Sequence, residues 1–451
     1  MDHNASQFTF AGYEEDVQKG YVRFHYKLSS EEYNYDFTEA FSFPALSDEE
    51  TRRVPKSLLT NILDALHIAL GISYWKTVCS KNIMLTSITL SENQAKFWNT
   101  FYTKGLGEFY YKNSIDYRGL VSFPFVNSSI PNNVIPHIVT SDRSLVLLGA
   151  GKDSIVSSEL LKDYGQDFAL FSLNDWQVTK VVAEKIGKPL VTINRTIDPK
   201  LLELNKMNGI FNGHIPITAI FSLTALFAAI LYDFRFVIAS NEKSASYGNV
   251  EYLGSEINHQ WSKSFEFEIM LHDYIHRYVT ADIEYFSLLR PLTELRITQL
   301  FSKYENYFDV FTSCNRNFKI VEKDRTIGWC GECPKCAFVF LLLAACISKE
   351  KLLGIFHKNL FSSENVLHTY KELCGIDGFK PFECVGMPEE SLYAFMEVIS
   401  EGKFSDDYII RQLSDIVKSR YTEGHIAAET LLSTSHEHNI PKKFVPILST
   451  L

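Results

Sequence analysis

The sequence predicts an α/β fold built on a doubly wound parallel sheet, preceded by an α+β region and followed by a helical region. Short apolar runs alternate with helical segments from residue 144 onward, which is the pattern of strands joined by crossover helices. The first of these runs leads into a glycine turn, as strands do where a doubly wound sheet binds its ligand. We expect three parts, residues 1–135, 140–350 and 351–451.

The first part combines strands and helices. Residues 21–28 alternate apolar and polar side chains, which predicts a strand with one buried face, and residues 37–43 suggest a second strand. Residues 61–76 follow helical spacing, and a capping box at Ser91 and Gln94 begins another helix. A few polar side chains among apolar neighbours either reach a site or form the solvated edge of a helix: His67, Tyr74, Lys76 and Glu108.

The second part supplies the parallel sheet. Strands are predicted at residues 145–148, 168–173, 190–193, 236–239 and 283–289, and the apolar run 217–232 is predicted to be a buried helix too short to cross a bilayer. Ligands of such sheets bind at the carboxyl ends of the strands. Asn174 and Asp175 end the second strand and are candidates to face a nucleoside, although Asn-Asp is also common helix-capping chemistry.

The turn after residue 148 is the strongest candidate ligand site. Gly149 and Gly151 can take positive φ and come close to a ligand, while a helix starting near Asp153 directs free N–H groups at the turn, so we expect it to bind an anion. The stretch fits neither the Walker loop nor the dinucleotide fingerprint. A glycine turn that merely joins a strand to a helix is the alternative.

Two later segments follow predicted strand ends and carry ionisable groups. His214 lies in Asn212–Pro216, at the start of the apolar helix, and His259, Lys263, Glu266 and Glu268 lie at about one-turn spacing, so a helix would gather some of them on one side. Among these residues, the candidate acids and bases are His214, His259, Lys263 and Glu268. The alternative is a salt-bridged, solvated helix face.

Four cysteines, Cys314, Cys330, Cys333 and Cys336, form the candidate metal site. CxxC spacing lets neighbouring sulfurs converge on one tetrahedral centre, and zinc fits a closed all-sulfur site best. An iron–sulfur cluster also uses four cysteines, and a redox-active turn with Cys314 in the core is a further alternative.

The last part of the chain reads as short amphipathic helices, including residues 389–400 and 406–420, and suggests no chemistry.

Composition favours a small-molecule substrate. The chain has 451 residues, 46% of them hydrophobic, and acidic residues exceed basic ones by 54 to 44, a net charge of -10. With no basic run, binding to nucleic acid or to a membrane surface is disfavoured. The first 20 residues lack the features of a secretory signal, so we expect a cytoplasmic protein. The oligomeric state stays open.

The glycine turn resembles the SGGxDS loop of the N-type ATP pyrophosphatases, with Gly149 in place of the serine and Ala150 in place of a glycine. The resemblance implies that ATP and Mg²⁺ bind at Gly149, Ala150, Gly151, Lys152, Asp153 and Ser154. Four segments taken together, the loop, RPLTELRIT, the SCN of Cys314 and WCGECPKC, resemble the plan of 7-cyano-7-deazaguanine synthase. That protein is an AMP-forming enzyme with a four-cysteine zinc site.

Across nearly the whole chain, the sequence resembles the UDP-N-acetylmuramoyl-L-alanyl-L-glutamate epimerases of peptidoglycan synthesis. LHIALGISYWK, GLGEFYYKNSID, LLGAGKDSIVSSELL, NGHIPITAI, SEINHQWSKSFEFE and WCGECPKCAFVF carry this resemblance. It implies an ATP- and Mg²⁺-dependent inversion of the terminal L-glutamate through an acyl adenylate, with release of AMP and diphosphate. Two alternatives remain: another AMP-forming enzyme that makes an amide or nitrile, and a nucleotide sensor without catalysis.

Overall fold

The computed structural model describes residues 6–126, 135–319, 323 and 325–448. The main sheet has nine strands: β1 (Gln7–Asp16), β2 (Tyr21–Ser29), β3 (Asn34–Ser42), β4 (Asn82–Leu85), β5 (Ser144–Leu147), β6 (Phe168–Leu173), β7 (Leu190–Thr196), β8 (Phe236–Ala239) and β11 (Glu284–Ser287). Two short strands, β9 (Val250–Tyr252) and β10 (Ser255–Ile257), pair separately.

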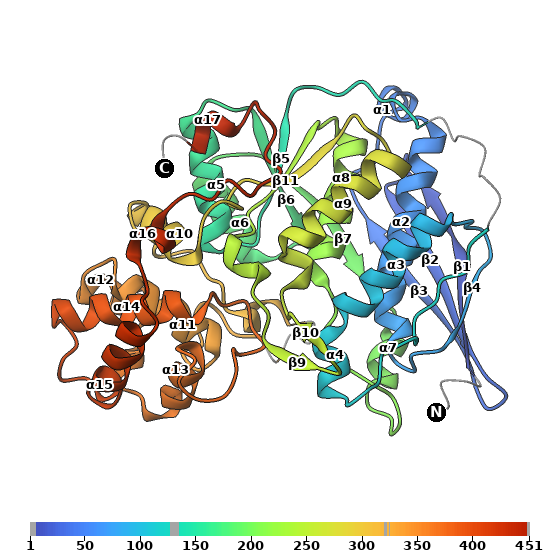
Figure 1. Ribbon diagram of the computed structural model, residues 1–451. Helices are drawn as coiled ribbons and strands as arrows, with labels where there is room; N and C mark the ends of the chain where they lie inside the picture. Colours follow the sequence, from blue (N-terminus) through green and yellow to red (C-terminus); the bar gives the residue numbers. More distant parts are fainter. Residues whose placement is uncertain (1–5, 127–134, 320–322, 324, 449–451) are drawn as a thin grey trace.

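The main sheet runs in the order β11-β8-β5-β6-β7-β3-β2-β1-β4 (Figure 1). Its first five strands are all parallel, and β5, the first of them along the chain, lies in the middle. The order therefore reverses between β5 and β8, which is the strand order of a doubly wound fold. The segments that follow β5 and β8 face each other at this switch point, where such sheets bind ligands.

Helices surround the sheet and fill the remainder of the chain: α1 (Asp48–Arg53), α2 (Lys56–Trp75), α3 (Glu92–Gly105), α4 (Gly107–Lys112), α5 (Lys152–Asp163), α6 (Gln177–Ile186), α7 (Pro199–Leu204), α8 (Ile217–Tyr232), α9 (Phe265–Tyr278), α10 (Glu294–Phe301), α11 (Pro334–Ala344), α12 (Lys349–Phe356), α13 (Leu367–Leu373), α14 (Pro388–Glu401), α15 (Tyr408–Glu423), α16 (Ala428–Leu432) and α17 (Val445–Leu448).

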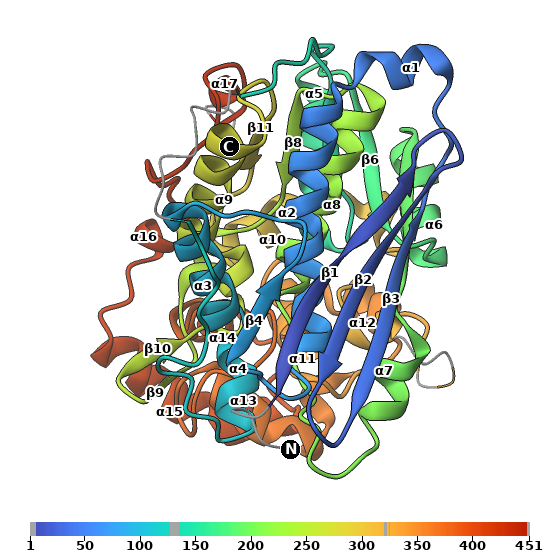
Figure 2. The same cartoon turned by 90° about the vertical axis from the view of Figure 1, so that its right-hand side faces the viewer.

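Alternate residues of β5 pack against different helices. Leu145 and Leu147 lie in one apolar core with α2, α8 and α9, whereas Val146 and Leu148 lie in a second core with α5, α6 and α11. Figure 2 shows α6 and α9 on opposite sides of the sheet. This alternation follows from the period of two along a strand, and it explains why strands covered on both faces read as continuous apolar runs.

The antiparallel strands of the N-terminal part extend the same sheet. β3 pairs with the end of β7 through residues 40–42 and 194–196, and a buried ion pair, Arg195 Nε to Glu39 Oε1 at 2.6 Å, lies at this junction. The strands predicted at 21–28 and 37–43 are confirmed as β2 and β3. The longer β1 was not predicted because its register shifts between Phe10 and Tyr13, which interrupts the alternation.

Helix α2 is long and apolar enough to cross a membrane by length and composition alone, but 78% of its apolar window is buried inside the protein. It packs on β1, β2 and α8 and is a core helix. The apolar run 217–232 is confirmed as the buried helix α8.

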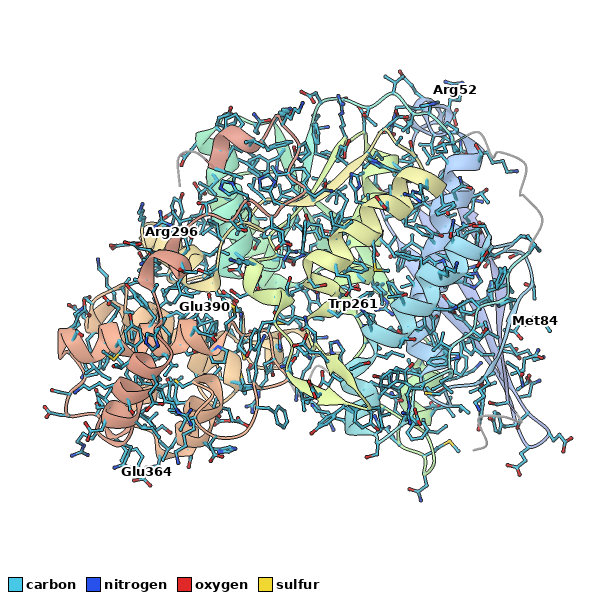
Figure 3. The ribbon with its side chains drawn as sticks, in the orientation of Figure 1. Arg52, Met84, Trp261, Arg296, Glu364 and Glu390 are labelled. Atoms are coloured by element: carbon cyan, nitrogen blue, oxygen red, sulfur yellow. The ribbon has the colours of Figure 1, made fainter. Side chains whose placement is uncertain are left out.

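The helical C-terminal region is confirmed, and α14 and α15 match the predicted helices. It packs against the α/β part through an apolar core that α11 shares with the sheet. Glu390 of α14, labelled in Figure 3, lies where the two meet, and its carboxylate accepts a hydrogen bond of 3.0 Å from the backbone N–H of Leu295. The division into residues 1–135, 140–350 and 351–451 stays a prediction, because one sheet spans the first two parts and one core joins the last two.

Candidate functional site

The loop of residues 149–151 joins β5 to α5 at the switch point. Its left-handed residue is Ala150, with φ of 58°, rather than either glycine, and Gly151 is the N-cap of α5 with φ of -88°. A Cβ on Gly151 would lie 2.7 Å from Ser313 Oγ, whereas a Cβ on Gly149 would meet no atom of the described residues within 4 Å. Gly151 therefore lets the loop pack closely against Ser313, whereas the position that a Cβ on Gly149 would take is open.

The first turn of α5 leaves its N–H groups available. Within the described ranges, no side chain caps this helix, and Ser154 Oγ donates to the Gly151 carbonyl at 3.0 Å. Free N–H groups and the positive end of the helix dipole favour an anion in front of the loop.

Three carboxylates lie beside the loop. Asp153 comes from α5, Glu242 from the segment after β8, and Glu294 begins α10; one oxygen of each lies within 4.8 Å of the others. Carboxylate oxygens are the ligands that Mg²⁺ prefers, and Mg²⁺ commonly uses one or two of them together with substrate phosphates. Asp153, expected to hold the metal, thus has two partners that sequence reasoning did not select.

Two buried lysines compensate the negative charge. Lys152 contacts both Asp153 and Glu294, and Lys335 Nζ lies 3.1 Å from Glu294 Oε1. Burial alone would raise the pKa of Glu294, but the two ammonium groups hold it at about 2. Lys152, which we expected to contact phosphate, is fully buried and pairs with the carboxylates of Asp153 and Glu294.

Two of the candidate acids and bases lie together. His214 and His259 approach the same carboxylate: His259 Nδ1 lies 2.5 Å from Glu108 Oε2, and His214 Nδ1 lies 3.4 Å from it. Burial would lower the pKa of His259, but hydrogen bonding to Cys384 and Glu108 raises it to about 9. Burial, followed by the charge on His259, lowers the pKa of His214 to about 3. The opposite pKa shifts thus favour a protonated His259 beside a neutral His214.

Lys263 and Glu268 do not share a helix face with His259. His259 precedes a 3-10 turn (Trp261–Lys263), and α9 begins only at Phe265, because Ser264 caps it. Glu268 is buried and accepts hydrogen bonds from Arg290 Nε at 2.9 Å and from the backbone N–H of Ser287. Arg290 in turn donates to the carbonyls of Glu242 and Lys263. Glu268 therefore supports the site through Arg290, away from the two histidines.

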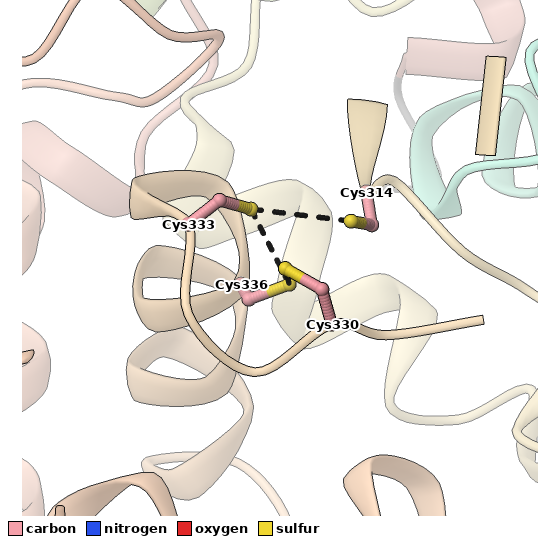
Figure 4. A group of neighbouring side chains, drawn as sticks. All are labelled: Cys314, Cys330, Cys333 and Cys336. Atoms are coloured by element: carbon pink, nitrogen blue, oxygen red, sulfur yellow. Dashed lines mark hydrogen bonds between the residues drawn. The ribbon is translucent and has the colours of Figure 1, made fainter. Parts of the chain in front are cut away.

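The four cysteines converge as predicted from their spacing (Figure 4). The Sγ atoms lie 4.0 Å apart for Cys314 and Cys333, 3.6 Å for Cys330 and Cys336, and 3.4 Å for Cys333 and Cys336. A tetrahedral zinc ion with sulfur ligands at about 2.3 Å needs sulfur separations of about 3.8 Å. The four side chains therefore fit a single tetrahedral ion.

The two residues before Cys314 contact the glycine loop directly. The backbone N–H of Thr312, two residues before Cys314, donates to the Ala150 carbonyl at 3.1 Å, and Ser313 is the residue that packs on Gly151. A group that fixes the position of Cys314 would thus also fix the position of the glycine loop.

The other polar residues considered in the sequence make hydrogen bonds within the protein. His67 is buried among aromatic rings, with its Nε2 3.0 Å from the His25 carbonyl. The Tyr74 hydroxyl accepts from the backbone N–H of Asp198, and Lys76 Nζ donates to Asn212 Oδ1. Asn174 accepts from the backbone N–H of Arg195, so it stabilises the end of β6.

Sequence reasoning missed Glu242, Glu294, Lys335 and Cys384. Glu294 and Lys335 lie within RPLTELRIT and WCGECPKC, whose resemblance to an AMP-forming enzyme was a usable signal. Cys384 had none, since it lies in a loop of the helical region, between α13 and α14.

Comparison with known proteins matches both ends of the chain to one family. A family model described as the MurL N-terminal domain matches residues 1–288, and one described as the MurL C-terminal domain matches residues 310–427. Three curated relatives carry the name UDP-N-acetyl-alpha-D-muramoyl-L-alanyl-L-glutamate epimerase. The protein of Xanthomonas oryzae pv. oryzae is 35% identical, over 97% of this chain and 96% of its own. That of a Micromonospora species is 37% identical, over 98% and 97%, and that of Salinispora tropica is 38% identical, over 91% and 88%.

Proposed function

Since this chain belongs to the MurL family, we propose that it is an epimerase that inverts the terminal L-glutamate of UDP-N-acetylmuramoyl-L-alanyl-L-glutamate in peptidoglycan precursor synthesis. The observation that carries the proposal is the similarity to epimerases of this name along nearly the full length of the chain. A nucleotide-linked substrate agrees with the expected cytoplasmic location and with the absence of any basic run in the sequence.

Inversion requires removal of the α-proton of the glutamate, which is weakly acidic because the carbanion would lie beside a full negative charge. Conversion of the carboxylate to a mixed anhydride with AMP removes that charge. The activated carbonyl then stabilises the enolate that forms when a base takes the proton. Protonation on the opposite face and hydrolysis of the anhydride release the D-glutamate form and AMP.

The glycine loop and α5 form the proposed ATP site of an N-type pyrophosphatase core. The support is positional: the loop lies at the switch point, its backbone is open at Gly149, and the first turn of α5 presents free N–H groups. These groups would bind the phosphates while the substrate carboxylate attacks the α-phosphorus. Asp153 and Glu242 would hold Mg²⁺, which supplies charge neutralisation to the departing diphosphate.

The four cysteines are proposed to hold a structural zinc ion. Zinc would contribute folding free energy and would keep residues 312–314 packed on the loop. In this role, zinc would need no contact with the substrate.

The test is incubation with ATP, Mg²⁺ and UDP-N-acetylmuramoyl-L-alanyl-L-glutamate, followed by measurement of AMP and diphosphate and by chiral analysis of the glutamate. Formation of D-glutamate with one AMP per turnover supports the proposal. A stable amide formed in the presence of ammonia would instead identify a ligase. ATP binding without diphosphate release under any of these conditions would identify a nucleotide sensor.

A further inference from the structure

A cysteine of the helical region completes the histidine group. Cys384 lies in the loop between α13 and α14, and its Sγ is 4.0 Å from Nε2 of His259. The other ring nitrogen of His259 lies 2.5 Å from Glu108 Oε2. A thiol, an imidazole and a carboxylate are thus aligned across three distant parts of the chain.

We propose that the Cys384 thiolate takes the α-proton on one face of the activated glutamate, and that His259 and Glu108 are positioning residues that orient and stabilise the thiolate. The inference rests on the proposed function, because the glutamate must first be activated by ATP. It assigns the acid–base group that the family resemblance left open.

The loop that carries Cys384 is fastened to the α/β part by side chains. Asn249 Nδ2 donates to the carbonyls of Lys380 and Pro381 at 3.0 and 2.8 Å, and its Oδ1 accepts from the backbone N–H of His259 at 2.8 Å. Gln260 Nε2 donates to the Val385 carbonyl at 2.9 Å. The same buried asparagine therefore sets the positions of both the thiol loop and the imidazole.

Four cationic groups, three from other segments and one from its own loop, act electrostatically on the thiol. Lys263 comes from the 3-10 turn, His259 from the segment before it, Lys335 from α11, and Lys380 from the loop of Cys384 itself. Burial would raise the pKa of Cys384, but Lys263 and His259 lower it to about 7, so the thiolate is abundant near neutral pH. Burial raises the pKa of Cys346, another partly buried cysteine, to about 12.

The proposed step balances without a redox partner. The thiolate removes the proton from the α-carbon, an S–H bond forms, and the electron pair of the C–H bond enters the enolate of the acyl adenylate. A second acid returns a proton to the opposite face, and Lys263 is the candidate within this cluster. Exchange of the thiol proton and of the ammonium with solvent restores both groups.

The test separates activation from proton transfer in the full-length protein. ATP–diphosphate exchange that depends on the dipeptide substrate measures activation, and incorporation of deuterium at the glutamate α-carbon in D₂O measures proton transfer. We expect Cys384→Ala to retain diphosphate exchange within about threefold and to lose deuterium incorporation by about 10³-fold, as is typical when a general base is removed. Cys384→Ser should behave alike, because its hydroxyl is a far weaker acid. Cys346→Ala is the matched control and should retain both reactions.

Glu108→Gln tests the positioning role. Without the carboxylate, the pKa of His259 falls and its positive charge stabilises the thiolate less. The pH at which deuterium incorporation is half-maximal should therefore rise from about 7 toward the ordinary thiol value. A merely structural role would lower the rate equally at every pH.

The outcomes are distinguishable. Absence of substrate-dependent diphosphate exchange in the wild-type protein would refute the proposed function itself. Wild-type exchange together with deuterium incorporation above a tenth of the wild-type rate in Cys384→Ala would overturn the assignment of Cys384. Loss of both reactions in both Cys384 variants, or a thioester trapped on Cys384, would also overturn it, because the thiol would then serve activation or act as a nucleophile.

Discussion

Replacing Gly149 with alanine tests whether the loop grips a triphosphate. Gly149 does not adopt positive φ, and the added Cβ would meet no protein atom within 4 Å in the ranges that the structure describes. The substitution should therefore leave the fold intact, or stabilise it by about 0.4–1 kcal/mol through the unfolded chain. A phosphate in contact with this backbone would be displaced by roughly 1 Å, a misplacement that can cost about 10²-fold in rate.

The assays are thermal unfolding, calorimetric titration with a non-hydrolysable ATP analogue and substrate-dependent diphosphate exchange. We expect an unchanged or higher melting temperature with at least about tenfold weaker nucleotide binding, or about 1.4 kcal/mol. Gly354→Ala is the control, since its Cβ would also meet nothing within 4 Å but lies on α12. Wild-type affinity and exchange in Gly149→Ala would refute the reasoning, because no phosphate could then lie against this backbone.

Four further predictions concern the metals, the thiol and the sheet. Metal analysis should find one zinc ion per chain, and Cys336→Ser should lose it and weaken ATP binding; unchanged ATP binding without zinc would contradict the coupling of the two sites. Glu242→Gln should raise the Mg²⁺ concentration for half-maximal diphosphate exchange by about tenfold, equal to about 1.4 kcal/mol. Deuterium incorporation should rise with pH through about 7, where Cys384 loses its proton, and fall near 9, where His259 does; a flat profile from pH 6 to 8 would count against the thiolate. In urea unfolding, Arg195→Met should cost about 3–5 kcal/mol because Glu39 stays buried without its partner, whereas Arg23→Ala, which breaks an exposed pair, should cost at most about 1 kcal/mol.

Local patterns were enough to predict the parallel half of the sheet. The runs 168–173 and 236–239 coincide with β6 and β8, since strands buried on both faces need apolar side chains at every position. The continuity of the sheet was beyond such reasoning. It depends on the pairing of β3 with β7, far apart in the chain, and on the Glu39–Arg195 ion pair, which has no periodicity to read.

How well the sequence predicted which candidate residues come together depended on how close they lie in the chain. The glycine loop and the CxxC group lie within short stretches, so their spacing alone located them. The spacing of His259, Lys263 and Glu268 misled because a serine cap starts α9 only after Ser264. Cys384 reaches His259 through tertiary packing alone, and no short-range pattern marks it.

The hydrogen bonds of Asn249 to the Cys384 loop bear on how much ATP is consumed for each inverted glutamate. The proposed ATP site lies at the parallel sheet, whereas the thiol that is proposed to take the α-proton belongs to the C-terminal region. If the Cys384 loop separated from the α/β part, ATP would be consumed to form an anhydride that hydrolyses to the unchanged L-isomer. A buried clamp that ties the two together guards against that futile cycle.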